Sequence, residues 1–123
     1  METKIFEQTF TVTEDKTAQA MGSGDLPVLA TPAMIAAMEN AAMLCAADLL
    51  EEGMTTVGVH MNAEHNKASA IGAKVTARAT LVKHTGRSFH FTVDAYEGDE
   101  QVGVGEHTRV ALDRVRFMAK LAK

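Results

Sequence analysis

The chain has 123 residues, of which 46% are hydrophobic and 23% charged, with a formal net charge of −4 at pH 7. This length and composition are typical of one soluble globular domain, so we expect residues 1–123 to form a single domain. The acidic balance disfavours nucleic acid as a partner, because nucleic-acid binding usually requires a basic face. No apolar run approaches the roughly 18 residues of a membrane span, and the first ten residues lack a signal-peptide pattern. We therefore expect no membrane partner.

Residues that bind metals or form disulfides are sparse. The one cysteine, Cys45, cannot form a disulfide within the chain, which favours a reducing cytoplasm as the compartment. The five histidines are scattered, and neither CxxC nor HExxH spacing occurs, so we expect no metal site and no other bound cofactor.

The first quarter of the chain is expected to contain a strand and a long connection. Residues 4–12 alternate apolar side chains with threonines, which predicts a strand. Residues 13–29 contain a Gly-Ser-Gly tract and a proline, and we expect this connection to pack as a flap.

A long helix should follow the flap. Thr31 can cap a helix and Pro32 fits its first turn, so the helix is expected to begin there. It should extend to about Glu51, because Gly53 supplies a left-handed stop.

Alternating side chains and turn residues predict four more strands and a short C-terminal helix. The strands are expected at residues 55–66, 74–84, 88–96 and 101–112, and the helix at 115–122. The long helix is apolar on nearly all sides, so an antiparallel sheet must curve around it and a second copy of the chain must cover the rest. We expect an α+β fold and a homodimer.

One charged residue interrupts the apolar helix. Glu39 lies one turn from Ile35 and from Met43, so it sits within an apolar stripe. A buried carboxylate without a partner costs several kcal/mol, so the chain must either pair this group or use it. The alternative without a catalytic role is that Glu39 and Asn40 form a narrow solvent-exposed face of the helix, or that Glu39 makes a structural ion pair.

A histidine is expected to point toward the same helix. His65 ends the strand face that begins with Val57, and that face should pack on the helix. A carboxylate and a histidine that converge in a partly dry cleft can activate water or a carbonyl group. The alternative is that His65 is a structural histidine at a strand end, with its hydrogen bonds made within the core. His90 and His107 could be cross-strand neighbours, which makes an ion site between them a weak possibility.

Three motifs carry a resemblance to a known family. They are ATPAMIAAME at residues 30–39, GVHMNAEH at residues 58–65 and GEHTR at residues 105–109. With the order of elements, they resemble hotdog-fold thioesterases, and most of all the fluoroacetyl-CoA thioesterase family. The resemblance covers residues 16 to about 117. It implies a hotdog fold, with a long helix wrapped by a curved antiparallel sheet, and hydrolysis of an acyl-CoA with a small acyl group.

The resemblance also implies site residues. Thr31, Glu39 and His65 take the places of the family's catalytic threonine, glutamate and histidine. Gly58 and Arg109 take those of substrate-binding residues. Glu39 would act as nucleophile or as base toward water, His65 would carry the proton, and Thr31 would orient the histidine or contact the substrate. The CoA phosphates would need cations, for which the available side chains are Lys67, Lys74, Arg78 and Lys83.

Two other functions remain alternatives on the same fold. A hotdog hydratase or dehydratase typically pairs an aspartate with a histidine five residues later, and no aspartate in this sequence has such a histidine. A non-catalytic acyl-CoA-binding module would not need the threonine, glutamate and histidine together. The flap also has no aromatic residue, unlike the lid of the family's specialised member. The acyl group, its carrier (CoA or acyl carrier protein) and the choice between dimer and tetramer stay open.

Overall fold

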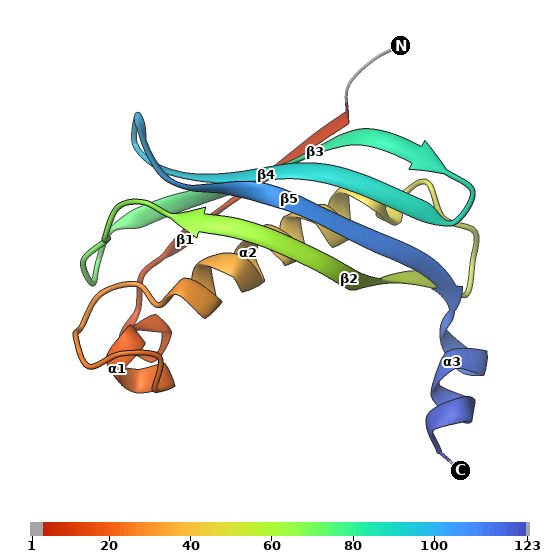
Figure 1. The fold of residues 1–123 in the computed structure, drawn as a ribbon, viewed down its shortest axis with the longest axis horizontal. Helices are drawn as coiled ribbons and strands as arrows, with labels where there is room; N and C mark the ends of the chain where they lie inside the picture. The colour runs from red at the N-terminus through yellow and green to blue at the C-terminus, as the bar shows by residue number, and fades with distance from the viewer. Residues whose placement is uncertain (1–3, 123) are drawn as a thin grey trace.

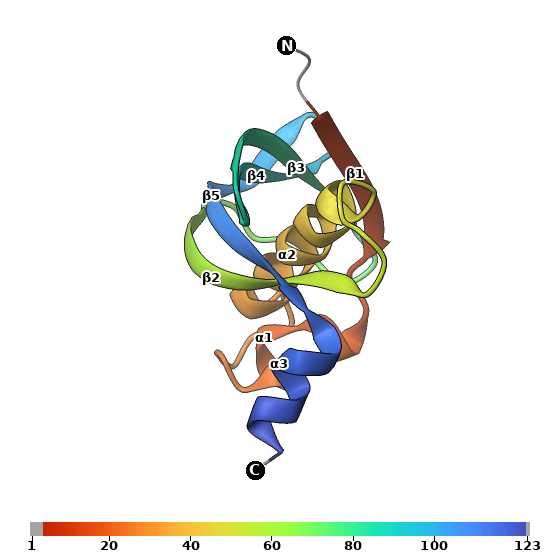
Figure 2. The ribbon, with the colours of Figure 1, turned by 90° about the vertical axis from the view of Figure 1, so that its right-hand side faces the viewer.

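The computed structural model describes residues 4–122 and shows a five-stranded antiparallel sheet that curves around one long helix (Figure 1). The strands are β1 (Lys4–Thr11), β2 (Met54–His65), β3 (Lys74–Thr85), β4 (Ser88–Glu97) and β5 (Glu100–Asp113), and their order in the sheet is β1-β3-β4-β5-β2. The helices are α1 (Ala18–Met21), α2 (Thr31–Ala47) and α3 (Arg114–Leu121), with a 3-10 turn η1 at Glu14–Lys16. Figure 2 shows α2 lying inside the curve of the sheet. The predicted α+β class is confirmed.

The bounds of the long helix differ from the prediction at both ends. Ala30 occupies the N-cap position, so Thr31 is the first helical residue and its hydroxyl does not cap the helix. Pro32 lies in the first turn, as expected. The helix ends at Ala47 rather than near Glu51, because the next residues tighten into turns closed by backbone bonds such as that from the Leu49 N–H to the Ala46 carbonyl.

The core lies between α2 and the middle strands of the sheet. The alternation predicted for β3 and β4 is confirmed, since Val75, Ala79, Phe89 and Phe91 all point inward and are fully buried. They pack on the buried stripe of α2. That stripe consists of Met34, Met38, Ala41, Ala42, Cys45 and Ala46.

The alternation predicted for β2 is wrong in its first half. A β-bulge shifts the register between Gly58 and His60, so that one residue is left without a partner on β5. Val59 is consequently 59% exposed, whereas Thr56 on the other side of the bulge is buried. Beyond the bulge His65 is half-buried, as the prediction required. Bulges of this kind re-aim side chains and are frequent beside functional sites.

The flap is held at its base by backbone hydrogen bonds. The Ala18 N–H donates to the Val28 carbonyl, and Thr17 forms an isolated bridge with Leu29. Thr17 is buried and its hydroxyl caps α1. The tip of the flap, residues 21–27, is exposed.

Close packing between β5 and β2 depends on a glycine. A Cβ placed on Gly105 would lie 2.7 Å from the Cα of Ala63 and would also meet the Asn62 carbonyl, and neither backbone atom can move freely. We expect Gly105→Ala to lower the free energy of unfolding by about 1–3 kcal/mol, measured by urea denaturation. Glu106→Ala, at the exposed neighbouring position, is the control. A Gly105→Ala protein as stable as this control would contradict the packing described.

Among residues 4–122, none of the helices has the length and apolar character needed to cross a membrane.

Candidate active site

Thr31 and His65 meet at one end of the molecule. Thr31 begins α2 and His65 ends β2, and the Thr31 Oγ1 lies 2.7 Å from the His65 Nδ1, forming a hydrogen bond. Because Ala30 rather than Thr31 is the N-cap, the threonine hydroxyl is free for this contact. The pair lines a hollow of ≈ 270 Å³ beside Ser23 of the flap and Lys67. We call this space the histidine hollow.

The second nitrogen of His65 is buried and has no hydrogen-bond partner within the described chain. Burial lowers the pKa of His65, against a smaller raising effect from the Lys67 backbone. The imidazole is therefore largely neutral at neutral pH and can accept a proton. Buried polar atoms without a partner are uncommon in native proteins, and a catalytic role is one reason for such an atom.

Glu39 lies in a different hollow, of ≈ 380 Å³, which we call the glutamate hollow. It is lined by Glu39, Asn40 and Met43 of α2 and by Thr56, Gly58 and Arg109 of the sheet. Glu39 and Asn40 are both half-buried. Gly58 and Arg109, expected near the substrate, are therefore brought together with Glu39.

Gly58 is what allows these groups to approach the strand. A Cβ on Gly58 would lie 3.2 Å from the Glu39 Oε2, 3.4 Å from the Arg109 Nη1 and 2.9 Å from the His107 Cε1. A larger residue would fill the space where a carboxylate, a guanidinium group and an imidazole converge. The substrate-binding role that the resemblance implies for Gly58 is consistent with this crowding.

Arg109 is a fixed, buried cation and not a solvated strand residue. Its side chain is only 7% exposed. Its Nε donates to the Thr56 hydroxyl at 2.7 Å and its Nη2 donates to the Thr56 carbonyl at 2.8 Å. Burial lowers the pKa of Arg109, while the nearby Glu39 raises it. Since an arginine remains charged in proteins, the glutamate hollow carries a permanent positive charge beside Glu39.

His107 is a member of this site that the sequence prediction missed. Its Nδ1 donates to the His60 carbonyl at 2.8 Å, and its Nε2 accepts from the Arg109 Nη1 at 3.1 Å. The ion site considered for His90 and His107 is wrong, because His90 pairs with Thr108 in the sheet. A usable signal was present: in the motif GEHTR, His107 and Arg109 are two residues apart and so share one face of a strand.

Within one chain the structure does not bring Glu39 and His65 together. Thr31 and Glu39 are eight residues apart on α2, which corresponds to about 12 Å along the helix axis. The histidine hollow and the glutamate hollow share no lining residue. The five predicted residues thus form two groups, one of Thr31 and His65 and one of Glu39, Gly58 and Arg109. The expected meeting of carboxylate and histidine is wrong for a single chain.

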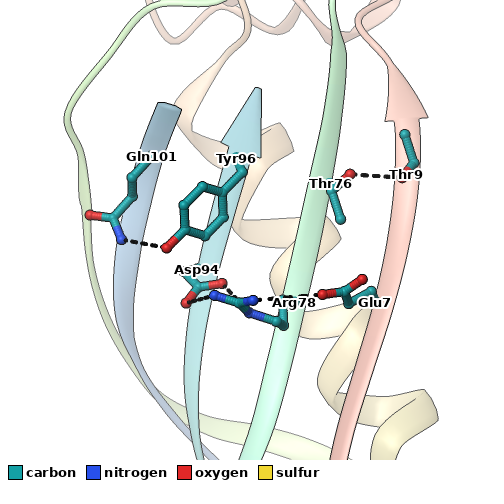
Figure 3. A network of polar contacts seen from close by, with 7 residues as sticks. All are labelled: Glu7, Thr9, Thr76, Arg78, Asp94, Tyr96 and Gln101. Carbon is teal, nitrogen blue, oxygen red and sulfur yellow. Dashed lines mark hydrogen bonds and ion pairs between the residues drawn. The ribbon is translucent and has the colours of Figure 1, made fainter. Parts of the chain in front are cut away.

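Two of the cationic side chains expected to meet the CoA phosphates, Lys67 and Arg78, lie in different places. Lys67 lines the histidine hollow, although its Nζ lies 3.0 Å from the Glu100 Oε1. Arg78 lies on the outer face of the sheet, where it makes two hydrogen bonds to Asp94 and an ion pair with Glu7 (Figure 3). Of these two, only Lys67 is placed to meet a substrate in the histidine hollow.

The buried histidines predict a loss of stability in acid. Burial lowers the pKa of both His65 and His107 in the folded state, relative to a value near 6.5 in the unfolded chain. Their contribution is fully present above about pH 6.5 and is lost as the pH falls through the lowered values. We expect the free energy of unfolding in urea to decrease from pH 7.5 to pH 5.

His107→Gln should reduce this decrease, because glutamine does not titrate. His60→Gln is the control, since its side chain is exposed and the backbone carbonyl is kept. Equal free energies of unfolding at pH 7.5 and pH 5 for the unmodified chain would contradict the prediction.

The described residues contain no cluster of three or more His, Cys, Asp or Glu side chains that could hold a metal ion. What the site offers instead is two neutral imidazoles, one carboxylate and one buried guanidinium group. These are groups that transfer protons and stabilise negative charge on oxygen.

Solved structures with the same architecture identify the class of protein. A solved structure of the fluoroacetyl-CoA thioesterase FlK aligns with a TM-score of 0.91 at 29% sequence identity, covering 99% of this chain and 96% of that chain. A thioesterase superfamily member from Thermus thermophilus aligns with a TM-score of 0.85 at 29% identity, covering 98% and 88%. The fold and site therefore define a thioester hydrolase of the hotdog fold, as predicted.

Sequence comparison identifies the family. The family model described as fluoroacetyl-CoA-specific thioesterase, FlK, matches residues 12–115. The fluoroacetyl-CoA thioesterase of Streptantibioticus cattleyicolor is 33% identical over 94 residues, which cover 76% of this chain and 68% of the relative. The chain belongs to the fluoroacetyl-CoA-specific thioesterase family.

Proposed function

We propose that the chain hydrolyses a short acyl-CoA thioester at a site that two copies of the chain complete together. The observation that carries the proposal is the separation of Thr31 and His65 from Glu39 into two hollows of one protomer. One hollow holds the imidazole that can carry a proton, and the other holds the carboxylate and the guanidinium group. CoA as the carrier is supported by a variant of FlK crystallised with fluoroacetate and CoA, which is 30% identical over 95% of this chain.

The edge of the sheet supports the dimer. β2 is an edge strand of 12 residues, and within residues 4–122 no strand pairs with its outer side. Two copies can pair these edges in antiparallel fashion about a two-fold axis. If that axis passes between Met61 and Asn62, Gly58 of one protomer lies opposite His65 of the partner subunit. The glutamate hollow of each protomer would then face the histidine hollow of its partner.

Exposed apolar side chains near this edge point to the same arrangement. In α3, which follows β5 directly, Val115, Met118 and Leu121 are each at least 60% exposed. On α2, Ala36 and Leu44 are exposed on the side not covered by the sheet. A second copy would bury these surfaces. We expect light scattering at micromolar concentration to give the mass of a dimer, and a stable monomer would overturn the proposed arrangement.

The residues support two routes for the reaction. In one, Glu39 takes a proton from water, whose oxygen adds to the thioester carbonyl, and the C–S bond breaks to release the CoA thiolate. In the other, Glu39 attacks the carbonyl and releases the thiolate, and water activated by neutral His65 hydrolyses the resulting anhydride. In both, the thiolate gains the proton that the water lost, and the carboxylic acid and free CoA are the products.

Charge on the substrate oxygen is stabilised by the same site. The negative charge that develops on the carbonyl oxygen lies near the buried Arg109, which needs no rearrangement to stabilise it. Thr31 holds the His65 ring through its Nδ1 and leaves the other nitrogen for the proton. Neither route requires a metal or cofactor. We also propose the cytoplasm as the compartment, where acyl-CoA occurs and where the buried Cys45 thiol stays reduced.

Thiol release from a panel of acyl-CoA thioesters of increasing chain length tests the function. We expect turnover of short acyl groups, fluoroacetyl and acetyl among them, because the glutamate hollow is small and contains a charged side chain. Long alkyl chains should react poorly, because they offer the buried guanidinium group of Arg109 no hydrogen-bond acceptor. No thiol release from any member of the panel would overturn the proposed function.

A further inference from the structure

The contacts of Arg109 leave a specific part of its guanidinium group free. Of its five N–H groups, one on Nε and one on Nη2 bind Thr56, and one on Nη1 binds the Nε2 of His107. The second N–H of Nη1 and the second N–H of Nη2 have no partner among these contacts. Nη1 lies 3.4 Å from the point where a Cβ on Gly58 would sit, and the same point is 3.2 Å from the Glu39 Oε2. Nη1, with its second N–H, therefore borders the space between Gly58 and Glu39.

We infer that His107 is a positioning residue for hydrolysis, which holds the Arg109 Nη1 at this space by accepting its hydrogen bond as the neutral Nδ1–H tautomer. The inference rests on the proposed function, because it assumes that the glutamate hollow binds the reacting carbonyl. It concerns a residue that the resemblance to the family did not single out.

Hydrogen-bond chemistry fixes the tautomer. The His60 carbonyl can only accept, so the His107 Nδ1, at 2.8 Å from it, must carry a hydrogen. The Arg109 Nη1 can only donate, so the His107 Nε2, at 3.1 Å from it, must be unprotonated. A protonated imidazole would place an N–H against an N–H and a second positive charge beside the guanidinium group. One ring thus links the bulged strand β2 to the charged side chain of β5.

The groups around His107 favour the neutral ring. Burial is the largest influence and lowers the pKa of His107, and Arg109 and His60 lower it further. The His60 carbonyl and the Glu39 carboxylate of α2 act in the opposite direction. On the β4 side the neighbour is the uncharged ring of Phe91, at 6.2 Å between ring centroids.

A long-range ¹H–¹⁵N correlation spectrum of the intact protein at pH 7.5 tests the tautomer directly. We expect the His107 ring to show a protonated Nδ1 and an unprotonated Nε2, with the signals assigned by their loss in His107→Gln. A protonated Nε2, or a doubly protonated ring, would overturn the inference. This measurement needs no substrate and no folded variant other than the one used for assignment.

Kinetics test the positioning role. His107→Met replaces the imidazole acceptor with a thioether that accepts hydrogen bonds only weakly, and we expect kcat/KM to fall at least about tenfold, because misplaced catalytic groups cost rates of that order or more. His107→Gln, whose amide oxygen can accept from Arg109, should retain kcat/KM within about threefold of the unmodified chain. His60→Gln, which keeps the carbonyl partner, is the control. Equal rates for His107→Met and the unmodified chain would overturn the inference while leaving the proposed function intact.

Coupling to Arg109 separates positioning from a merely structural role. In an Arg109→Met background, His107→Met should cause no further loss of kcat/KM, because residues that act through one another show non-additive effects. An equal loss in both backgrounds would overturn the inference. Melting temperatures of all variants show which are folded, and the spectrum decides the question if His107→Met is not. If the unmodified chain hydrolyses no acyl-CoA, the proposed function fails and the spectrum still tests the hydrogen-bond geometry.

Discussion

Glu39→Gln should lower kcat for acyl-CoA hydrolysis by about 10²–10⁴-fold, the range expected for loss of a catalytic acid or base. Both proposed routes need the carboxylate, either to take a proton from water or to attack the carbonyl. Glutamine has nearly the same shape as glutamate, so the substitution should not fill the glutamate hollow. The measurement is thiol release from each acyl-CoA that the unmodified chain hydrolyses.

The same substitution should leave the fold intact. Glu39 is half-buried and raises the pKa of Arg109, so its charge favours the buried guanidinium, and its removal should not stabilise the protein. Asn40→Ala, on the next residue of the same hollow, is the control for local packing. Near-normal turnover by Glu39→Gln on every substrate would show that this carboxylate is structural.

Mixing Glu39→Gln with His65→Ala should restore activity, although each variant alone is nearly inactive. If each site takes Glu39 from one protomer and His65 from the other, a mixed dimer contains one site with both residues intact. A random mixture should then recover about one quarter of the unmodified activity, because half of the dimers are mixed and each has one intact site of two. The variants are unfolded together in urea, refolded, and assayed for thiol release.

Two controls make this result decisive. Each variant refolded alone measures the background, and the unmodified chain treated in the same way measures the recovery from refolding. If Glu39 and His65 of one chain form one site, every site in the mixture has a lesion and no activity returns. The double variant on one chain should be little worse than either single variant, because residues that act as one unit lose activity non-additively.

Much of the fold was predictable from local patterns. The strands β3 and β4 follow from strict alternation, in which Val75, Ala77, Phe89 and Phe91 share the buried side. The start of α2 follows from the proline, although the cap proved to be Ala30. These features depend on residues close together in sequence, which is why a single sequence indicates them.

Parts of the site depend on features that a single sequence does not show. The bulge in β2 adds one residue to a strand and leaves no composition signal, so the face of Val57 and Val59 was predicted wrongly. The inward face of β5 carries His107 and Arg109, which a hydrophobic pattern assigns to solvent. The separation of Glu39 from His65 depends on how far α2 extends beneath the sheet. Such a distance arises only from the folded chain.

The bulge at Gly58–His60 also determines what a small deletion would do. A strand without Val59 would keep the pairs of Gly58 with Arg109 and of His60 with Thr108, so side chains on both sides of the deletion would keep their faces. Thr56 and His65 are an odd number of residues apart, so in a strand of the present length without a bulge they would lie on opposite faces. The extra residue is therefore what lets one strand direct Thr56 to Arg109 and His65 to Thr31.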